Sequence, residues 1–461
     1  MINKKKININ KISKGFIVIL FILASLLRIL YIHKIGVDEY QYDVGAKKLN
    51  HSNEAYEKIY EQNRDYLKEY RHLDYIMTIY NTGKLPSKNL VQLYHPPLHH
   101  LICAGWLKIL DFFPLSAMSK IESLQILTCI YSLIALFIIL KICDELKLKD
   151  FYKIIVLLFV GFNPLFIYMS GFISNDMLVS MLILLCFYLL LKWEKQPSYV
   201  NTILLGLAFG LGCATKTSMF VMLLIISGVV CFKWVKSISI GLAEYIITKK
   251  KDYKPTYKTK TFLIQTLLFL LISTPIALIH PYRNYKMFNQ PFLYVVPPSD
   301  RLVISDYNFI NRYTPFSKEL LTKTIEGTNK NIFAYAIKSD ILFMLSVEFH
   351  YSILLTYIII LLYLLSIFAS IYLAIKGNNL KINILIISCY IWLSSFIFFN
   401  TRLPASCTMH SKYIYAYIGL LPILNACFLQ KKNSYVLSMV VYALSTLFAV
   451  FSTFGMCMLL F

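Results

Sequence analysis

Apolar runs long enough to cross a bilayer recur from one end of this 461-residue chain to the other. A hydrocarbon core about 30 Å thick needs roughly 20 apolar residues in a helix to span it. Because backbone groups inside lipid must be paired within the protein, runs of this length predict transmembrane helices. The mean hydropathy of +0.60 and the 57% hydrophobic content agree. We therefore expect an all-α polytopic membrane protein.

The positions of the runs predict about eleven spans. The first, residues 15–32, has no small-residue cleavage site and continues into a charged segment, so we expect a retained span rather than a signal peptide. The other ten are expected at residues 121–142, 151–169, 177–191, 203–214, 220–235, 262–279, 351–375, 382–399, 413–429 and 436–461. No linker long enough to divide the chain is present, which predicts a single domain over residues 1–461.

Residues 96–113, "PPLHHLICAGWLKILDFF", are apolar but short, and they contain two histidines and a lysine. If this segment crossed the membrane, the lysine-rich turns at 141–153 and 249–260 would lie outside, against the positive-inside rule. We therefore expect an interfacial or re-entrant helix. The lysines before the first span then place the N-terminus in the cytoplasm and the C-terminus outside.

This topology leaves two large extracytoplasmic loops, residues 34–120 and 281–346. Residues 34–94 hold nine of the 24 acidic residues of the chain. The net charge of +22 comes from lysines in short loops, not from a basic patch, so we expect no nucleic-acid partner. The ten cysteines form no CxxC pair and are interpreted as small core residues. Chemistry is expected on the acidic, extracytoplasmic face.

Two groups of acids are candidates for that chemistry. "GVDEYQYDVG" places Asp38, Glu39 and Asp43 just beyond the first span, where a carboxylate can act as a general base; a solvated acidic loop is the alternative. Asp176 is the only acid between residues 150 and 194. Acids at a membrane boundary are costly and usually functional, but in "SND" Asp176 could also cap the next helix.

Basic residues on the same face are candidates for binding a phosphate. Lys216 stands alone in "GLGCATKTSMF", and Arg283 follows the seventh span in "HPYRNYKMF". An ammonium in so apolar a segment needs an anion, and the planar guanidinium suits two phosphate oxygens. Anchoring at the membrane interface remains the alternative for each.

The histidines of "YHPPLHH" begin the interfacial helix. Proline is tolerated in a first helical turn and forces the residue before it out of the helical region, so His95 is expected at the start of that helix. His95 and His99 are four residues apart, a spacing compatible with zinc. No HExxH pattern accompanies them, so no metal site is expected.

Together these segments resemble the GT-C membrane glycosyltransferases, in particular bacterial members similar to glycosyltransferase family 39 and the protein O-mannosyltransferases. The similar stretches are "DEYQYDVG", "HLDYI" with "TGKLP", "YHPPLHH", "SGFISNDMLVS", "GLAFGLGCATKTS", "PYRNYKMFNQPFLYV" and "CTMHSKYI". The resemblance implies a GT-C-like bundle with interfacial helices in the first outer loop. The chain departs from the family pattern in two places. "SKYI" has Lys412 where an arginine is usual, and the stretch after "YDVG" is long and charged.

The resemblance also implies roles for individual residues. The catalytic base falls on Asp43 or Asp38, with Asp43 preferred, and Asp176 organises the site. The expected substrate-binding residues are Glu39, His72, His95, His99, Lys216, Arg283 and Lys412.

The implied function is inverting transfer of a sugar from a polyprenyl-phosphate donor to an acceptor hydroxyl. No glycine-rich phosphate loop or αβ alternation is present to hold a nucleotide sugar, which agrees with a lipid-linked donor. The acceptor is a glycan, lipid or protein, the other partners are membrane lipids, and the expected location is the plasma membrane. No cofactor is needed; a divalent metal is compatible but not required. A transporter or flippase of lipid-linked sugars is the alternative, although no inverted repeat is visible.

Overall fold

The computed structural model describes residues 9–35, 72–88, 91–248, 257–295, 304, 308–315, 317–322, 328, 330–342, 351–376 and 379–460. Every regular element within these ranges is a helix, as the apolar runs predicted. The predicted candidates Asp38, Glu39 and Asp43 lie outside the described residues.

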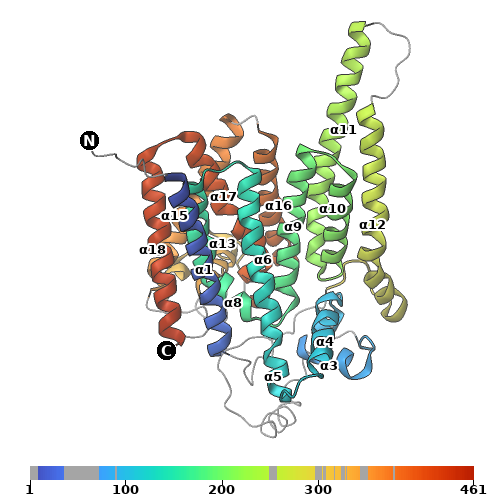
Figure 1. Ribbon diagram of the computed structural model, residues 1–461, viewed down its shortest axis with the longest axis vertical. Coiled ribbons are helices and arrows are strands. Elements are labelled where there is room, and N and C mark those ends of the chain that lie inside the picture. The colour runs from blue at the N-terminus through green and yellow to red at the C-terminus, as the bar shows by residue number, and fades with distance from the viewer. Residues whose placement is uncertain are drawn as a thin grey trace, which may run out of the picture.

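The helices at the positions of the predicted spans stand side by side in one bundle (Figure 1). They are α1 (Ile9–Ile35), α6 (Leu124–Glu145), α7 (Asp150–Phe162), α8 (Pro164–Gly171), α9 (Asn175–Lys195), α10 (Tyr199–Cys213), α11 (Val221–Thr248), α12 (Tyr257–Phe288), α15 (Ser352–Lys376), α16 (Leu380–Arg402), α17 (Tyr415–Lys432) and α18 (Tyr435–Leu460). The other described helices are α3 (His72–Thr82), η1 (Val91–Tyr94), α4 (Leu98–Leu110), α5 (Ala117–Glu122), η2 (Thr217–Phe220), α13 (Phe309–Tyr313), η4 (Lys318–Leu321), α14 (Ile332–Leu342), η6 (Ser406–Met409) and η7 (Ser411–Ile414).

Nine spans of the described chain are long and apolar enough to cross a membrane, and α7 with α8 makes a tenth if this pair, bent by 52°, is one span. These ten correspond to ten of the eleven predicted spans. The remaining one, 203–214, is α10, whose 15 residues extend only about 22 Å. The protein is therefore a multi-pass membrane protein in which α10 is shorter than the hydrocarbon core.

The short helix α10 packs closely against α12 because its facing residues are glycines. A Cβ added at Gly210 would lie 3.0 Å from Cβ of Ile276 and 3.3 Å from the Ser273 carbonyl oxygen. One at Gly206 would lie 3.3 Å from the Phe269 carbonyl oxygen. The spacing of four residues puts both glycines on one face, as at other close crossings of membrane helices.

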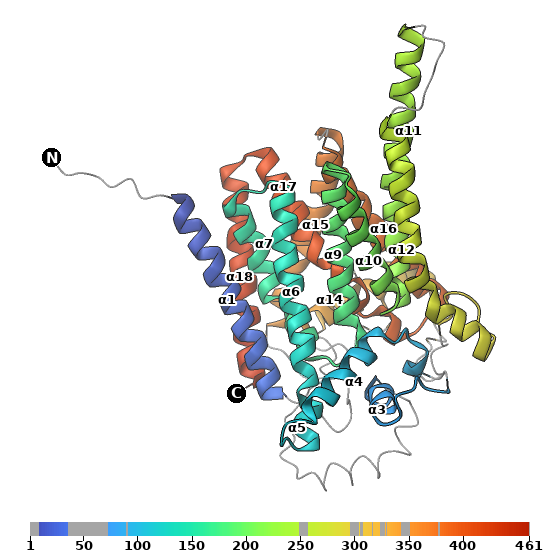
Figure 2. The ribbon, with the colours of Figure 1, turned by 45° about the vertical axis from the view of Figure 1, so that its right-hand side comes forward.

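The two ends of the bundle differ in character. The turns from α6 to α7, α9 to α10 and α17 to α18 lie at the end where α1 begins, and they carry Lys147, Lys149, Lys195, Lys431 and Lys432 (Figure 2). We call this the lysine-rich end. The helices α3, α4 and α5 lie at the opposite end, where α18 finishes.

The interfacial helix predicted in residues 96–113 is α4. It has 13 residues, too few for a crossing, and it lies obliquely at the end of the bundle (Figure 2). Pro97 is its N-cap residue, so His95 precedes the helix, as the two prolines predicted.

Part of the predicted second outer loop, 281–346, is built into the bundle. Within α14, Ile332 and Ile341 are fully buried, and so are the charged residues Lys338 and Asp340. Lys338 Nζ donates to Thr356 Oγ1 of α15 at 2.9 Å, and Tyr363 of α15 donates to Asp340 at 2.9 Å. Paired polar side chains thus allow this polar helix to pack inside an apolar bundle.

Candidate active site

Asp176 lies in the first turn of α9, at the end of the bundle away from the lysine-rich end. Its neighbour Ser174 is extended (φ −145°, ψ 166°), and the Ser174 hydroxyl oxygen accepts a hydrogen bond from the Asp176 backbone N–H at 3.2 Å. The N-cap of α9 is therefore Ser174, not Asp176. Because the cap is provided by Ser174, the Asp176 carboxylate is available to partners from other parts of the chain.

Two lysines distant in sequence reach this carboxylate. Lys216 Nζ donates a hydrogen bond to Asp176 Oδ1, and Lys412 Nζ lies 3.7 Å from Asp176 Oδ2. The Asp176 side chain is 4% exposed, and the two lysine side chains are 10% and 11% exposed. We call these three residues the ionic cluster. Because the ionic cluster is buried, each of its charges is stabilised by the opposite charge beside it and not by water.

The ionic cluster carries one more positive than negative charge. Among the described residues, Asp176 is the only carboxylate within 4.0 Å of either ammonium. Aromatic faces surround the two cations: Lys216 Nζ lies 4.9 Å from the ring centre of Tyr413, and Lys412 Nζ lies 4.8 Å from that of Phe172. Such faces favour a cation but do not neutralise it. The arrangement is therefore suited to binding an anion.

Backbone contacts hold the two lysines in place. Asn175 Nδ2, beside Asp176, donates to the Thr215 carbonyl at 3.0 Å and so ties α9 to the segment carrying Lys216. The N–H of Ser411 donates to Ser339 Oγ of α14 at 2.9 Å, which fixes the helix carrying Lys412. The site thus depends on the contact between α14 and η7.

Histidines form the adjoining part of the site. His72 Nδ1 and His100 Nε2 share a hydrogen bond of 2.9 Å, and the two rings stack with centres 5.2 Å apart. The His95 ring also stacks with that of His72, with centres 5.5 Å apart, and Tyr75 stacks on His100 at 4.0 Å. We call these four residues the histidine stack. It attaches α3 to the start of α4.

Burial keeps the three histidines of the histidine stack, and the neighbouring His99, neutral. Desolvation lowers the pKa of His72, His95 and His100 well below its usual range, and it lowers the pKa of His99 to about 4. Nearby cations such as Lys216 act in the same direction on His72 and His95. The four imidazoles therefore add no charge near neutral pH.

We expect this burial to make the protein less stable in acid. The folded pKa of His99, about 4, lies below the value of 6.5 for an exposed histidine, so the unfolded chain binds a proton more readily. Above pH 6.5 His99 is neutral in both the folded and the unfolded state and leaves stability unchanged. As the pH falls from 6.5 towards 4, the unfolded chain takes up the proton first, and the free energy of unfolding decreases. One such histidine changes the free energy of unfolding by up to about 1.4 kcal/mol per pH unit.

Thermal unfolding of the purified protein at pH 7 and pH 5 measures this dependence. His99→Gln should reduce the difference in Tm between the two pH values, whereas substitution of the exposed His33 by glutamine should leave it unchanged. An identical pH dependence in His99→Gln and the unsubstituted protein would contradict the expectation.

The spacing of His95 and His99 is compatible with zinc, and the structure shows the neighbours of both rings. Within the described ranges, no three His, Cys, Asp or Glu side chains lie so that they could share a metal ion. The His99 ring instead contacts the Cys103 sulfur, with Nε2 3.6 Å from Sγ. The His95 ring stacks with that of His72 and contacts that of Tyr94 at a tilt of 35°, with ring centres 4.2 Å apart. The two histidines therefore contact different side chains.

Two side chains in the last turns of α12 donate hydrogen bonds to the backbone of η1 and of the segment that follows α3. His280 Nε2–H donates to the Tyr94 carbonyl at 2.9 Å, and Arg283 Nη2 donates to the Pro86 carbonyl at 2.6 Å. Arg283, predicted to bind phosphate, therefore uses one of its N–H groups to hold the protein backbone. The structure places it beside the site but not in the ionic cluster.

Sequence reasoning missed several residues of the site. It singled out His99 through its spacing from His95, but His100 is the histidine that bonds to His72. It also passed over Phe172 and Tyr413, whose rings face the lysines. The adjacent histidines of "LHH" and the tyrosine of "SKYI" were visible in the sequence, but only packing selects among such residues.

Comparisons with known proteins bear on this arrangement. Residues 89–285 match the family described as dolichyl-phosphate-mannose-protein mannosyltransferase. No curated protein sequence matches the chain. Among solved structures, the archaeal oligosaccharyltransferase AglB from Archaeoglobus fulgidus, in complex with an inhibitory peptide and a dolichol-phosphate, superposes with a TM-score of 0.50 at 11% identity over 97% of this chain. This chain has a GT-C fold.

A second structural neighbour is ArnT from Cupriavidus metallidurans bound to undecaprenyl phosphate, with a TM-score of 0.47, 13% identity and 92% of this chain covered. The chain spans only 62% of that ArnT and 56% of AglB. The family match covers the segment from η1 to α12, which contains Asp176 and Lys216 but not Lys412. The resemblance inferred from the motifs is confirmed.

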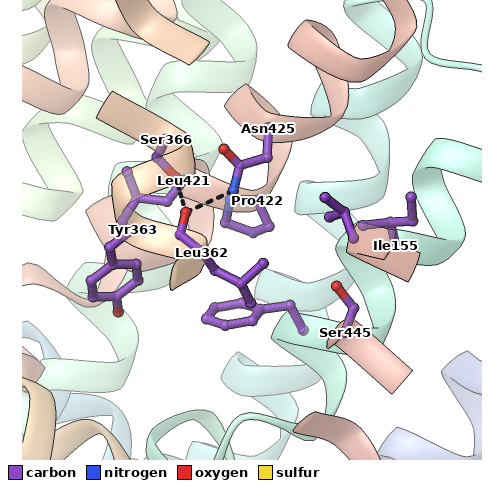
Figure 3. Close-up of a pocket in the computed structure, with 10 residues that line it drawn as sticks. Ile155, Leu362, Tyr363, Ser366, Leu421, Pro422, Asn425 and Ser445 are labelled. Carbon is purple, nitrogen blue, oxygen red and sulfur yellow. Dashed lines mark hydrogen bonds between the residues drawn. The ribbon is translucent and has the colours of Figure 1, made fainter. Parts of the chain in front are cut away.

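A small cavity inside the helical bundle lies apart from the ionic cluster. It lies between α7, α15, α17 and α18, and its lining includes Tyr363, Ser366, Pro422 and Asn425 (Figure 3). Asn425 Nδ2 donates to the Leu362 carbonyl at 3.1 Å beside it. None of the site residues named above lines this cavity. The candidate active site is therefore defined by its charged groups and not by this cavity.

Proposed function

We propose that the protein is an integral-membrane inverting glycosyltransferase that moves a sugar from a polyprenyl-phosphate donor to an acceptor hydroxyl on the extracytoplasmic face. The observation that carries the proposal is the ionic cluster, where Lys216 and Lys412 share the single carboxylate of Asp176. The unbalanced positive charge is available for the phosphate of the donor.

Two further facts support the proposal. The ionic cluster lies at the end opposite the lysine-rich end, and the positive-inside rule assigns that lysine-rich end to the cytoplasm. AglB and ArnT, which share the all-helical arrangement, have been solved with dolichol-phosphate and undecaprenyl phosphate respectively. A lipid-phosphate donor entering from the membrane is consistent with both.

The proposed reaction is a single displacement at the anomeric carbon. Asp43, or Asp38 in its place, takes the proton of the acceptor hydroxyl while the acceptor oxygen forms a bond to that carbon. The bond from the anomeric carbon to the phosphate oxygen breaks, and its electron pair leaves with the phosphate. Lys412 stabilises the charge that develops there. Since the phosphate is a good leaving group, no second carboxylate is needed as an acid.

Incubation of the purified protein with polyprenyl-phosphate sugars tests the proposal. Consumption of the donor, with release of polyprenyl phosphate, is the expected result. A transporter of lipid-linked sugars would leave the donor chemically intact and move it only between leaflets of a vesicle. If no such donor is consumed but the lipid-linked sugar is moved between the leaflets of a vesicle, the protein is a transporter and not a transferase.

We expect Lys412→Ala to weaken binding of undecaprenyl phosphate by roughly 10-fold to 100-fold, the effect of removing one charge-assisted hydrogen bond. Lys216→Ala should also weaken donor use, together with stability, because its ammonium is the direct partner of Asp176. The matched control is Lys381→Ala, which removes a lysine whose side chain is also 11% exposed and which pairs with Glu145 at 2.7 Å in another part of the bundle. Titration calorimetry measures the three affinities. Equal affinities in Lys412→Ala and Lys381→Ala would exclude Lys412 from the phosphate site.

The orientation of the site can be tested with a native cysteine. Cys407 and Cys231 are the only exposed members of the ten cysteines, all of which are described, and Cys407 precedes Lys412 by five residues. We expect a membrane-impermeant maleimide to label Cys407 on intact cells, because the ionic cluster is assigned to the extracytoplasmic face. Cys407→Ser should lose the label. Labelling only after lysis would show that Cys407 faces the cytoplasm, which would contradict the expected topology.

A further inference from the structure

The buried chain that leads into the ionic cluster contains two interruptions of helical structure. Residues 161–176 are buried throughout. Asn163 is extended (φ −66°, ψ 127°) between α7 and α8, and Phe172 is extended (φ −85°, ψ 110°) after α8. Each interruption deprives the last carbonyls of the preceding helix of their N–H partners. Inside a membrane bundle those carbonyls must find other donors.

One face of α6 supplies donors to the carbonyls of α8. Gln125 Nε2 donates to the Gly171 carbonyl at 3.0 Å, and Ser132 Oγ donates to the Phe166 carbonyl at 3.3 Å. Thr128 Oγ1 donates to the Ser170 carbonyl at 2.8 Å and shares its proton with the Gln125 carbonyl at 2.9 Å. The three donors are spaced i, i+3 and i+7, so they lie on one side of the helix. We call them the α6 polar face.

Arg28 of α1 supports the other interruption. Its side chain is fully buried, and Nη1 donates to the Gly161 carbonyl, in the last turn of α7, at 2.8 Å. Arg28 Nε donates to Ser132 Oγ at 3.0 Å, which joins the guanidinium to the α6 polar face. A charged donor forms stronger hydrogen bonds than a neutral one. The two interruptions are thus held by one connected set of donors from α1 and α6.

This set of donors lies next to the segment that carries two residues of the site. Phe172 follows the capped end of α8, and its ring lies 4.8 Å from Lys412 Nζ. Ser174 then caps α9 and presents Asp176 to Lys216. A displacement of α8 along α6 would therefore move Phe172 and Asp176 together.

We propose that the α6 polar face and Arg28 are positioning residues, which hold α8 so that Phe172 and Asp176 frame the phosphate-binding lysines. The proposal rests on the proposed function for the identity of the ligand. Its structural part, the fixing of residues 172–177, does not depend on the ligand. The two parts can accordingly be measured separately.

The test compares three variants of the full-length protein in detergent. Thr128→Val keeps the shape of the side chain but removes the hydroxyl, and Thr128→Ser restores it. Ser388→Ala is the matched control, because Ser388 is fully buried and its hydroxyl, among the described residues, donates to the Ile384 carbonyl of its own helix at 2.7 Å. Hydrogen exchange of residues 172–177 reports on the backbone, and the affinity for undecaprenyl phosphate reports on the site.

We expect Thr128→Val to speed exchange at residues 172–177 and to weaken undecaprenyl phosphate binding roughly threefold to tenfold, the effect of losing one neutral hydrogen bond. Thr128→Ser and Ser388→Ala should match the unsubstituted protein. If Thr128→Val does not fold, Ser132→Ala replaces it with the same expectations. Unchanged exchange and affinity in the Thr128→Val or Ser132→Ala variant, or equal changes in Ser388→Ala, would overturn the proposal. Failure of the unsubstituted protein to bind undecaprenyl phosphate would instead count against the proposed donor, and exchange alone would then decide the positioning role.

Discussion

Asp43→Asn is expected to reduce sugar transfer about 100-fold to 10,000-fold while the protein still inserts in the membrane and binds the lipid donor. The amide keeps the shape of the carboxylate and its ability to form hydrogen bonds, but it cannot accept the proton of the acceptor hydroxyl. Single-turnover assays with a polyprenyl-phosphate sugar measure the rate, and binding of undecaprenyl phosphate provides the second measurement.

Asp38→Asn must be measured separately, because two neighbouring acids can perturb or partly replace each other. Asp43→Asn with normal turnover and Asp38→Asn with the large loss would move the base to Asp38. If both variants retained near-normal turnover, the assignment of the base to the first outer loop would be wrong. Asp74→Asn is the control, because Asp74 lies in the same predicted loop but on the described helix α3.

Asp176→Asn is expected to destabilise the protein by about 3–5 kcal/mol, the typical cost of breaking a buried ion pair. Asp176 is 3% exposed and is the only described carboxylate within 4.0 Å of Lys216 or Lys412, so its removal leaves two buried ammoniums uncompensated. Unfolding of the detergent-solubilised protein measures the loss. Transfer should fall as well, since the lysines are no longer held in place.

A double variant separates the loss of charge balance from the loss of function. Asp176→Asn combined with Lys216→Met removes one uncompensated ammonium, so it should recover stability without recovering transfer. Glu145→Gln is the control, because it breaks a less buried ion pair with Lys381. An Asp176→Asn variant as stable as Glu145→Gln would show that the ionic cluster is solvated and not buried.

Much of the fold could be predicted from local sequence patterns. An apolar run of bilayer length predicts a helix wherever it occurs, and ten of the eleven predicted spans correspond to helical segments long enough to cross a membrane for that reason. The lysine distribution correctly favoured an interfacial helix at residues 96–113, because charge asymmetry is also a local property. The prolines before α4 similarly predicted where that helix begins.

The candidate site was predictable only in part. Asp176 and Lys216 stood out because each is a lone charge in an apolar segment, and the structure brings them into direct contact. Lys412 was reached through a family resemblance and not through any local signal. Nothing in the sequence indicated that both lysines share the same carboxylate, since that depends on how η7 and η2 pack against α9.

The sequence by itself determined the class of the protein, its spans and the kinds of charged residue at one membrane face. The tertiary structure alone decided which of those residues meet: Lys412 with Asp176, His100 with His72, and Arg28 with the carbonyl of Gly161. The reason is physical. Hydrophobic burial selects helices from patterns a few residues long, whereas the pairing of buried polar groups depends on directional contacts between helices that lie far apart in the chain.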